Sequence, residues 1–437
     1  MKSPFLKLLL LGLLTGLLSI PLGLVLALVY EREGRSQRAV AEISQTWGSA
    51  QTLQGPVLSI PYRTRVVDAE GRVGVRSEVA HFLPARLAVS ARLSAEKRSR
   101  GIYEAVLYRS AVSLTGEFEP PTFAGWQLEA PEILWEGATL GLGIPHPHGV
   151  QGTPVLRFAG QPRDLFPGVP GGPWPSGMHA PVPLGPSPAA LPFQLDLELQ
   201  GSQSFELLPV GKETALEVAS AWPHPSFRGA FLPQRREVGP QGFSAEWRVS
   251  YFQRGFPQRW RASEEAAAVD PAQMQTSAFG VALVEPAGSY QQVARAVKYG
   301  FLFLGLTFLL FFMFELFGPT SLHPLHYFFV GFALCMFYLL VLSLSEHLPF
   351  AVAYATAATA CVLLIAGYAR AVLGERRRAM LLAAVLVFLY GFLYVLLQLE
   401  EYALLIGSVG LFVLLALVMY ATRRVDWYGG AKQPPSR

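Results

Sequence analysis

Five long apolar runs follow one another in the last third of the chain, with only short polar breaks between them. Each run is close to the roughly 20 residues that a helix needs to cross the hydrocarbon core of a bilayer. A soluble core would rarely need so many such runs in succession. The sequence therefore predicts a membrane domain over residues 299–420, with helices at Tyr299–Phe317, Tyr327–Leu344, Ala351–Tyr368, Ala379–Leu397 and Ala403–Tyr420.

A sixth apolar run, Leu8–Tyr30, lies near the N-terminus and is preceded by Lys2 and Lys7. It is longer than the apolar core of a signal peptide, and no small-residue cleavage site follows it before Glu31. We therefore expect residues 1–30 to form an uncleaved transmembrane anchor. The fold class is then a polytopic α-helical membrane protein with six transmembrane helices, one N-terminal and five C-terminal.

Residues 31–55 continue the helical pattern, because apolar residues such as Ile43 and Trp47 recur at spacings of three and four. This predicts a helical stalk that extends the anchor and ends near Gly55 and Pro56.

From Val57 onward the apolar period changes to two. Such alternation is typical of strands with one buried and one solvent-exposed face. Because it recurs between Gly and Pro breaks, residues 56–298 are predicted to form a large, mainly-β domain of antiparallel sheets packed as a sandwich. The clearest alternating segments are Leu87–Leu93, Val112–Phe118, Phe193–Leu199 and Phe243–Tyr251.

A stretch rich in Pro and Gly, residues 145–192, interrupts this alternation. We interpret His146–Pro192 as a long irregular connection over the surface. The pattern leaves open whether the β-rich region is one domain or two subdomains divided by this stretch.

Basic residues set the orientation. Arg370 and Arg376–Arg378 lie between the third and fourth C-terminal runs, and Arg423, Arg424, Lys432 and Arg437 follow the last run in the basic tail 421–437. Positive charge accumulates on the cytoplasmic side of membrane proteins. We therefore predict cytoplasmic N- and C-termini and place residues 31–298 on the periplasmic, or extracytoplasmic, side.

The remaining composition adds little chemistry. The formal net charge of +4 is mostly explained by these cytoplasmic anchors, so we expect no nucleic-acid partner. The two cysteines, Cys335 and Cys361, both fall inside apolar runs. The β-rich region therefore has no disulfide and needs an adequate hydrophobic core instead.

Motifs for catalysis are absent from the sequence. Gly211-Lys212 is followed by Glu213 and lacks the upstream glycine of a phosphate-binding loop. No zinc-protease, paired-cysteine or serine-elbow motif is found, and we interpret His146 and His148 as solvated loop residues rather than metal ligands. We expect a protein that is not an enzyme, with no metal and no cofactor; an enzyme acting on lipid or peptidoglycan is the catalytic alternative.

Within the apolar runs the sole ionisable group is Glu315, which we expect to reach water near the cytoplasmic end of its helix. A proton-driven transporter would need an ionisable relay deeper in the membrane. Small residues in the runs predict close helix packing. These residues are Gly300, Gly331, Gly391, Gly407 and Gly410.

Several stretches resemble the CreD family of bacterial inner-membrane proteins. They include residues 398–408 (QLEEYALLIGS), 418–428 (VMYATRRVDWY), 337–347 (FYLLVLSLSEH) and 221–233 (AWPHPSFRGAFLP). The resemblance implies an inner-membrane location and a role in cell-envelope integrity and colicin tolerance. It supplies no catalytic residues.

The densest polar and aromatic cluster of the β-rich region is formed by Trp222, His224, Pro225, Ser226 and Phe227. This cluster is our candidate surface for a ligand or partner; the alternative is a rigid corner packed by its two aromatic rings.

Two functions remain open. In the first, the protein is a non-enzymatic binding or scaffolding protein, anchored in the lipid bilayer, whose outer domain engages an envelope protein, lipid or glycan. The alternative is a transporter or flippase for a lipid-like or hydrophobic substrate.

Overall fold

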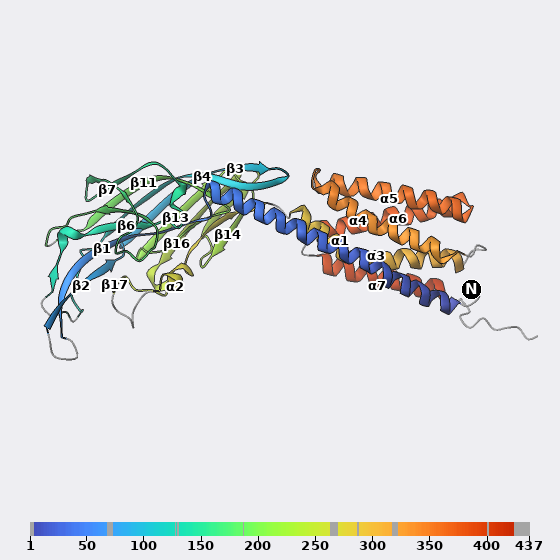
Figure 1. Ribbon diagram of the computed structural model, residues 1–437, viewed down its shortest axis with the longest axis horizontal. Helices are drawn as coiled ribbons and strands as arrows, with labels where there is room; N and C mark the ends of the chain where they lie inside the picture. Colours follow the sequence, from blue (N-terminus) through green and yellow to red (C-terminus); the bar gives the residue numbers. More distant parts are fainter. Residues whose placement is uncertain are drawn as a thin grey trace, which may run out of the picture. The chain divides into compact units, whose positions relative to one another are not determined.

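The structure is a computed structural model of the protein, and its ribbon is drawn in Figure 1. The chain divides into two compact units: a helical unit, Met1–Gln37 with Ala287–Arg437, and a β unit, Arg38–Pro286. The structure describes residues 4–67, 73–126, 128, 131–186, 188–262, 270–285, 288–316, 322–399 and 402–423.

The predicted membrane helices are all present as helices. Five of the described helices, α1 and α3–α6, are long and apolar enough to cross a membrane, and α7 contains a shorter apolar segment, Leu405–Tyr420. The apolar runs therefore located the helices correctly, although α3 begins ten residues earlier than its run. Their bounds are α1 (Pro4–Trp47), α3 (Ser289–Leu316), α4 (Pro324–Ser345), α5 (Phe350–Leu373), α6 (Arg376–Gln398) and α7 (Ala403–Thr422).

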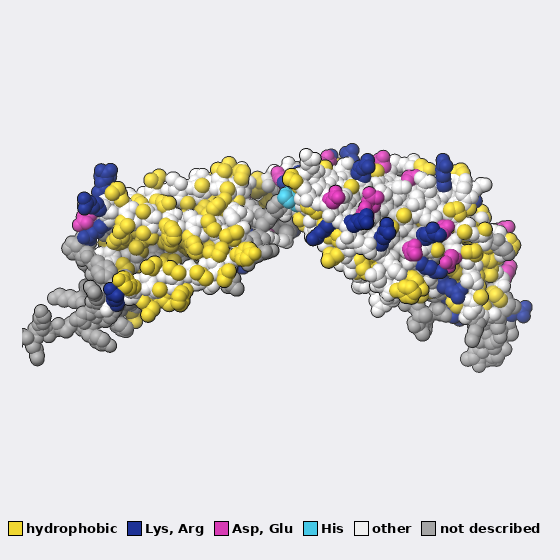
Figure 2. All heavy atoms as spheres, turned by 180° about the vertical axis from the view of Figure 1, so that it is seen from behind, with side chains coloured by type: hydrophobic (Ala, Val, Ile, Leu, Met, Phe, Trp, Pro, Cys, Tyr) yellow, Lys and Arg dark blue, Asp and Glu magenta, His cyan; other side chains and the backbone are white. Residues whose placement is uncertain are grey.

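The surface of the helical unit is apolar. Leu13, Phe388 and Phe412 expose 73%, 70% and 72% of their side chains, although each would be costly to expose to water. Figure 2 shows hydrophobic side chains covering the visible face of this unit, with Lys and Arg gathered at one of its ends. This distribution is that of a bundle whose outer face contacts lipid.

Inside the bundle, three of the five predicted packing glycines, Gly300, Gly331 and Gly410, lie at crowded contacts. A Cβ atom at Gly331 on α4 would lie 2.3 Å from Leu18 Cδ1 and 2.7 Å from Phe308 Cζ, and one at Gly300 would lie 3.0 Å from Tyr338. At Gly391 a Cβ would meet nothing within 4 Å. Close packing thus explains Gly331 and Gly300 but not Gly391.

We predict opposite effects of alanine at Gly331 and Gly391. Gly331→Ala should lower the free energy of unfolding by about 1–2 kcal/mol, because Leu18 and Phe308 must shift in a packed core. Gly391→Ala should be neutral or stabilising by about 0.5–1 kcal/mol, because alanine favours helix. Denaturant unfolding in mixed micelles measures both, and equal stabilities would show that α1, α3 and α4 are not packed as described.

At one end of the helical unit a buried ion pair joins α1 to α3. The ammonium of Lys7 contacts the Glu315 carboxylate, and the Tyr327 hydroxyl at the start of α4 donates to the other Glu315 oxygen at 2.9 Å. Only 10% of the Lys7 side chain and 12% of the Glu315 side chain are exposed. The expectation that Glu315 reaches water was therefore wrong, because Lys7 and Tyr327 cover it.

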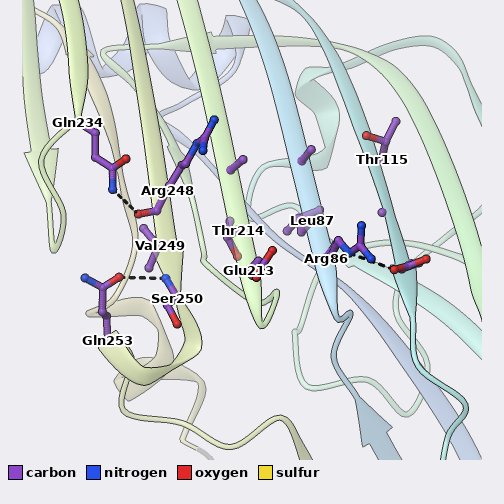
Figure 3. A pocket seen from close by; sticks show the side chains of 14 residues that line it. Arg86, Leu87, Thr115, Glu213, Thr214, Gln234, Arg248, Val249, Ser250 and Gln253 are labelled. Atoms are coloured by element: carbon purple, nitrogen blue, oxygen red, sulfur yellow. Dashed lines mark hydrogen bonds and ion pairs between the residues drawn. The ribbon is translucent and has the colours of Figure 1, made fainter.

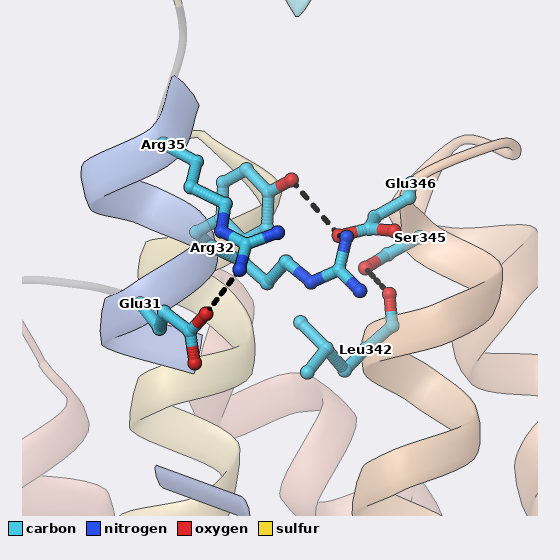
Figure 4. A network of polar contacts seen from close by, with 7 residues as sticks. Glu31, Arg32, Arg35, Leu342, Ser345 and Glu346 are labelled. Atoms are coloured by element: carbon cyan, nitrogen blue, oxygen red, sulfur yellow. Dashed lines mark hydrogen bonds and ion pairs between the residues drawn. The ribbon is translucent and has the colours of Figure 1, made fainter. Parts of the chain in front are cut away.

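At the other end of the same unit a second polar cluster links three helices (Figure 4). Glu346, which follows α4, accepts a hydrogen bond from the Tyr290 hydroxyl of α3 at 3.1 Å and lies 3.8 Å from the Arg32 guanidinium of α1. The Glu346 side chain is 11% exposed. Polar contacts therefore connect α1 to the other helices at both ends of the helical unit.

The α1 helix ends at Trp47, earlier than the predicted end of the stalk at residue 55. Gly48 takes a φ of 149°, which interrupts the helix, and β1 begins at Gln51 by pairing with β12. The C-terminal turns of α1 belong to the β unit and contact β3: Arg98 lies over the Trp47 ring at 4.1 Å, and Arg100 pairs with Glu42 at 2.7 Å.

The β unit contains two sheets, assigned over the described residues. The first follows the order β14-β18-β12-β1-β6-β10-β9, with β2, β5 and β17 beside this path. Its strands are β1 (Gln51–Val67), β2 (Val73–Phe82), β5 (Glu132–Ile133), β6 (Thr139–Gly143), β9 (Phe166–Pro167), β10 (Gly177–Pro181), β12 (Ser204–Leu207), β14 (Pro225–Gly229), β17 (Arg259–Arg261) and β18 (Phe279–Leu283).

The second sheet has the order β15-β16-β13-β3-β4-β11-β7-β8. The four alternating segments singled out in the sequence lie on strands of this sheet, except that Tyr251 follows the end of β16, so the period of two predicted these strands correctly. Its strands are β3 (Arg86–Arg100), β4 (Tyr103–Phe118), β7 (Val150–Phe158), β8 (Gln161–Arg163), β11 (Leu191–Ser202), β13 (Glu213–Ser220), β15 (Arg235–Gly239) and β16 (Gly242–Ser250).

The sheets are mixed rather than antiparallel, which corrects the prediction. β1 pairs with β12 in parallel, and β3 pairs with β13 in parallel, Arg86 opposite Glu213. Parallel partners need a long crossover connection. Here the chain passes through β4 to β12 before it returns beside β3, a path that alternation within one strand does not reveal.

The Pro-rich stretch is not an irregular connection, and this prediction was also wrong. It contributes β7 and β8 to the second sheet and β9 and β10 to the first. Its prolines are tolerated because Pro162 and Pro167 lie on outermost strands, and the β7–β11 ladder is broken by a register shift near Asp196. One hydrophobic cluster contains buried side chains of both sheets, from Val57 and Ile60 to Val89 and Trp247.

Candidate functional site

The solvent-exposed face of the second sheet carries a groove of about 900 Å³. Figure 3 shows its side chains rising from β16, β13, β3 and β4, with Arg248 and Arg86 on either side of β13. The sheet positions these residues because alternate side chains of each strand point away from the core. The lining residues are Arg86, Leu87, Ala88, Thr115, Gly116, Glu117, Glu213, Thr214, Ala215, Gln234, Arg248, Val249, Ser250 and Gln253.

Small side chains form the floor of this groove. The strand registers place Ala215 opposite Arg248 on one side and opposite Ala88 on the other, and Ala88 opposite Thr115. This row crosses four neighbouring strands with a single long side chain. The sheet surface is therefore low in the middle, which leaves room for a chain lying across the strands.

The next row of the sheet carries three carboxylates. Glu217 stands directly opposite Glu246, which faces Arg235 on its other side, and the row continues through Ser90 and Ser113 to Asp196. Like charges at directly opposed positions destabilise a sheet. Asp196 accepts a hydrogen bond from Ser113 at 2.6 Å, but among the described residues neither Glu217 nor Glu246 has an ion-pair partner. These two carboxylates are therefore available to a ligand.

The rim of the groove is fixed by polar contacts (Figure 3). Arg86 pairs with Glu117 at 3.2 Å, and the Gln234 amide donates to the Arg248 carbonyl at 3.2 Å. The Gln253 side chain accepts the Ser250 backbone N–H at 2.9 Å. These contacts hold the backbone around the groove in place. The Arg248 guanidinium extends away from the backbone of β16 (Figure 3).

Two further hollows extend the groove along the sheet. One of about 330 Å³ shares Ala88, Thr115, Ala215 and Arg248 with the first and adds Glu217 and Glu246. Another of about 530 Å³ is lined by Arg92 on β3, Asp196 and Glu198 on β11, and Gln151 on β7. We call the three together the sheet groove. Its length and its alternating carboxylate, guanidinium and hydroxyl groups suit an extended polar chain.

The predicted cluster Trp222–Phe227 lies elsewhere, on and before β14 at the edge of the first sheet. The Trp222 indole donates to the Val284 carbonyl at 2.9 Å, and the Phe227 ring packs edge-on against Trp247 at 5.8 Å. The structure therefore assigns both aromatic rings a packing contact. His224 and Ser226 are exposed, Pro225 is half-buried, and none of the five residues lines the sheet groove.

The two histidines of the Pro-rich stretch come together, with the His146 and His148 ring centres 6.0 Å apart. Within the described part of the chain, no group of three or more His, Cys, Asp or Glu residues is arranged to hold a metal ion.

Sequence reasoning missed the sheet groove. Its signal was the residue type at the solvent-facing positions of the alternating strands. Ala88 and Ser90 on β3 and Ala111 and Ser113 on β4 are small, whereas strand positions facing water are usually long or charged. The like-charged pair of Glu217 and Glu246 could not be found, because it depends on strand register.

Comparison with known proteins places the chain in a family. The sequence model of the family described as "Inner membrane protein CreD" matches residues 3–428. The chain belongs to the CreD family. The CreD-family relative from Escherichia coli K12, named inner membrane protein CreD, is 34% identical over 419 residues, which cover 94% of this chain and 91% of the relative.

CreD-family membership, together with the apolar helices, establishes a multi-pass inner-membrane protein. A solved structure of a proposed nutrient binding protein from Legionella pneumophila is also similar, at 9% identity over 57% of this chain and 86% of that protein. Its TM-score of 0.24 is too low to support any conclusion.

Proposed function

We propose that this CreD-family protein is a non-enzymatic binding protein of the cell envelope, and that its β unit engages an envelope component through the sheet groove. The observation that carries the proposal is the pair of exposed, unpaired carboxylates, Glu217 and Glu246, above a floor of small side chains. A protein retains such destabilising surface charge where a ligand uses it. Binding of this kind would support cell-envelope integrity and, through it, colicin tolerance.

The proposal includes a topology. All six apolar helices would cross the membrane, α7 among them, with both termini in the cytoplasm and a sandwich-like β unit in the periplasm. Arg370 and Arg376–Arg378 at the α5–α6 turn support it, because positive charge favours the cytoplasmic side. If the helices alternate in direction, Lys7 at the start of α1 and Arg423 at the end of α7 lie on the same side of the membrane as this turn.

The groove chemistry favours a peptide chain as the ligand. Carboxylates, guanidinium groups and hydroxyls match the amines, carboxylates and amide groups of an extended peptide. The groove lining offers no exposed aromatic ring on which a sugar could stack: Trp247 contributes to it but is 1% exposed. We therefore expect the peptide portions of the envelope, such as cell-wall peptide stems with free amino groups, to be the preferred ligands.

We predict that Glu217→Gln with Glu246→Gln weakens binding of soluble cell-wall peptides by about tenfold, because charge-assisted hydrogen bonds to an amine are lost. The same change should raise the stability of the β unit by about 0.5 kcal/mol, since the like-charge contact is removed. Calorimetric titration of the full chain in nanodiscs measures the first effect, and denaturant unfolding measures the second.

Two controls sharpen this test. Glu237→Gln removes an exposed carboxylate from β15 outside the groove and should change neither binding nor the preference for free amines. Acetylating the peptide amine should weaken binding to the unaltered protein as much as the double substitution does. Equal affinity of the double variant and the unaltered protein would contradict the sheet groove as the site.

The transporter or flippase alternative has one observation in its favour. Tyr338, Tyr354 and Tyr390 are buried in the core of the bundle, and a cleft opens between α3, α6 and α7. Such a cleft gives lipid access to the bundle. Lipid scrambling between the leaflets of proteoliposomes, dependent on this protein, would favour the alternative, and its absence favours the binding protein.

A further inference from the structure

An apolar cleft of about 450 Å³ lies between α3, α6 and α7. Its walls are leucine and phenylalanine side chains, among them Leu302 and Phe303 on α3, Phe388 on α6 and Leu414 on α7. The hydroxyl of Ser408, the polar group on its α7 wall, already donates to the Leu405 carbonyl at 2.9 Å. Apart from the Tyr299 hydroxyl near one end, the lining is apolar, so the occupant of the cleft must be largely apolar.

The cleft exists because α7 carries glycines where it approaches α6. A Cβ at Gly410 would lie 2.7 Å from the Phe392 ring, so α7 touches α6 there. One turn away, a Cβ at Gly407 would meet nothing within 4 Å. The missing side chain at Gly407 therefore leaves open space inside the cleft rather than a helix contact.

The cleft matches one leaflet of the bilayer. Its α7 wall runs from Gly407 to Leu417, which spans about 15 Å at 1.5 Å per residue, half of the roughly 30 Å hydrocarbon core. The lining begins near the start of α7, near Leu396 at the end of α6 and at Tyr299 toward the start of α3. All three segments lie at the same end of the helical unit, so the cleft spans one leaflet and not both.

A positive charge marks the outer end of the cleft. Lys298 is exposed and lies four residues before Leu302, so it occupies the helix face of α3 that lines the cleft, one turn closer to the membrane surface. Among the described residues Lys298 has no ion-pair partner. An ammonium at this depth is placed for a lipid phosphate group.

We propose that this cleft binds one anionic phospholipid, with an acyl chain between α3, α6 and α7 and its phosphate beside Lys298. The proposal does not depend on the sheet groove, and it holds whether or not the protein moves lipid. It assigns Gly407 the role of keeping the site open and Lys298 the role of selecting the headgroup.

The test uses the purified full chain, depleted of lipid in detergent and titrated with phosphatidylglycerol or with phosphatidylcholine of the same acyl chains. Native mass spectrometry counts the bound lipids. We expect one phosphatidylglycerol to bind about fivefold more tightly than phosphatidylcholine, the factor for one basic residue at the membrane surface. Lys298→Gln should remove this preference and leave phosphatidylcholine binding unchanged.

Gly407→Phe should weaken the binding of both lipids by about tenfold, which is the factor expected when two methylene groups of the acyl chain are displaced. Gly367→Phe is the matched control, because Gly367 is an exposed glycine on α5 with nothing within 4 Å of its Cβ position and outside the cleft. Unchanged lipid binding in G407F, or an unchanged phosphatidylglycerol preference in K298Q, would overturn the proposal. If G407F fails to fold, K298Q alone decides.

Discussion

Replacing Glu315 with Gln is expected to lower the free energy of unfolding of the helical unit by about 3 kcal/mol. The substitution leaves the Lys7 ammonium buried without its counter-ion, and removing one partner of a buried pair costs about 3–5 kcal/mol. The Tyr327 hydroxyl also loses a charged acceptor, which now receives its hydrogen bond at 2.9 Å. Unfolding of the full chain by sodium dodecyl sulfate in mixed micelles, followed by circular dichroism, measures the loss.

The double variant identifies the cause of this loss. Combining Glu315→Gln with Lys7→Met removes both charges, so most of the lost stability should return. Glu31→Gln is the matched control, because it breaks the Arg35–Glu31 pair of the same α1 helix, whose side chains are half exposed. That change should cost less than about 0.5 kcal/mol. A double variant as unstable as Glu315→Gln alone would show that the pair does not hold α1 to α3.

The Lys7–Glu315 contact also shows where sequence reasoning stops. The apolar runs located α1 and α3–α7, because a helix in lipid must satisfy its backbone internally and stay apolar over its length. Glu315 was expected in water because its own run offers no partner. Its partner is 308 residues away in the chain, and only the folded bundle brings the two together.

The same distinction applies to the β unit. Alternation within one strand predicted β3, β4, β11 and β16, since a period of two requires one buried face and nothing else. The sheet groove instead depends on which strands lie side by side. Ala88 and Ala215 become neighbours only because β13 pairs with β3 in parallel after a long excursion of the chain.

Proline was the source of the largest error. The density of Pro and Gly in residues 145–192 suggested irregular structure, because proline removes a ladder hydrogen bond. The stretch nevertheless supplies strands to both sheets, with Pro162 and Pro167 on outermost strands and Pro181 at the end of β10. The proline content of this stretch therefore indicated where hydrogen bonding between strands is weakest, but it did not mean that strands are absent.

Acidification is expected to destabilise the β unit through His81 on β2. Its ring is 2% exposed, accepts or donates one hydrogen bond with the Ser59 hydroxyl at 3.0 Å and lies 5.1 Å from the Trp260 ring. Burial lowers the pKa of His81 from 6.5 to about 4. Between these values the unfolded chain binds a proton that the folded chain does not, so stability falls as the pH falls.

This contribution is fully present above pH 6.5 and is lost progressively down to pH 4, with a total of about 3 kcal/mol. Amide exchange across the β1–β2 ladder of the full chain, measured at pH 7 and pH 4, reports it without contribution from the helical unit. His81→Gln keeps a group that hydrogen-bonds Ser59 but does not titrate. Between pH 7 and pH 4 this variant should therefore lose less stability than the unaltered protein, by this amount. His148→Gln, which replaces an exposed histidine, should behave like the unaltered protein. Equal pH dependence of His81→Gln and the unaltered protein would mean that His81 is protonated in the folded β unit.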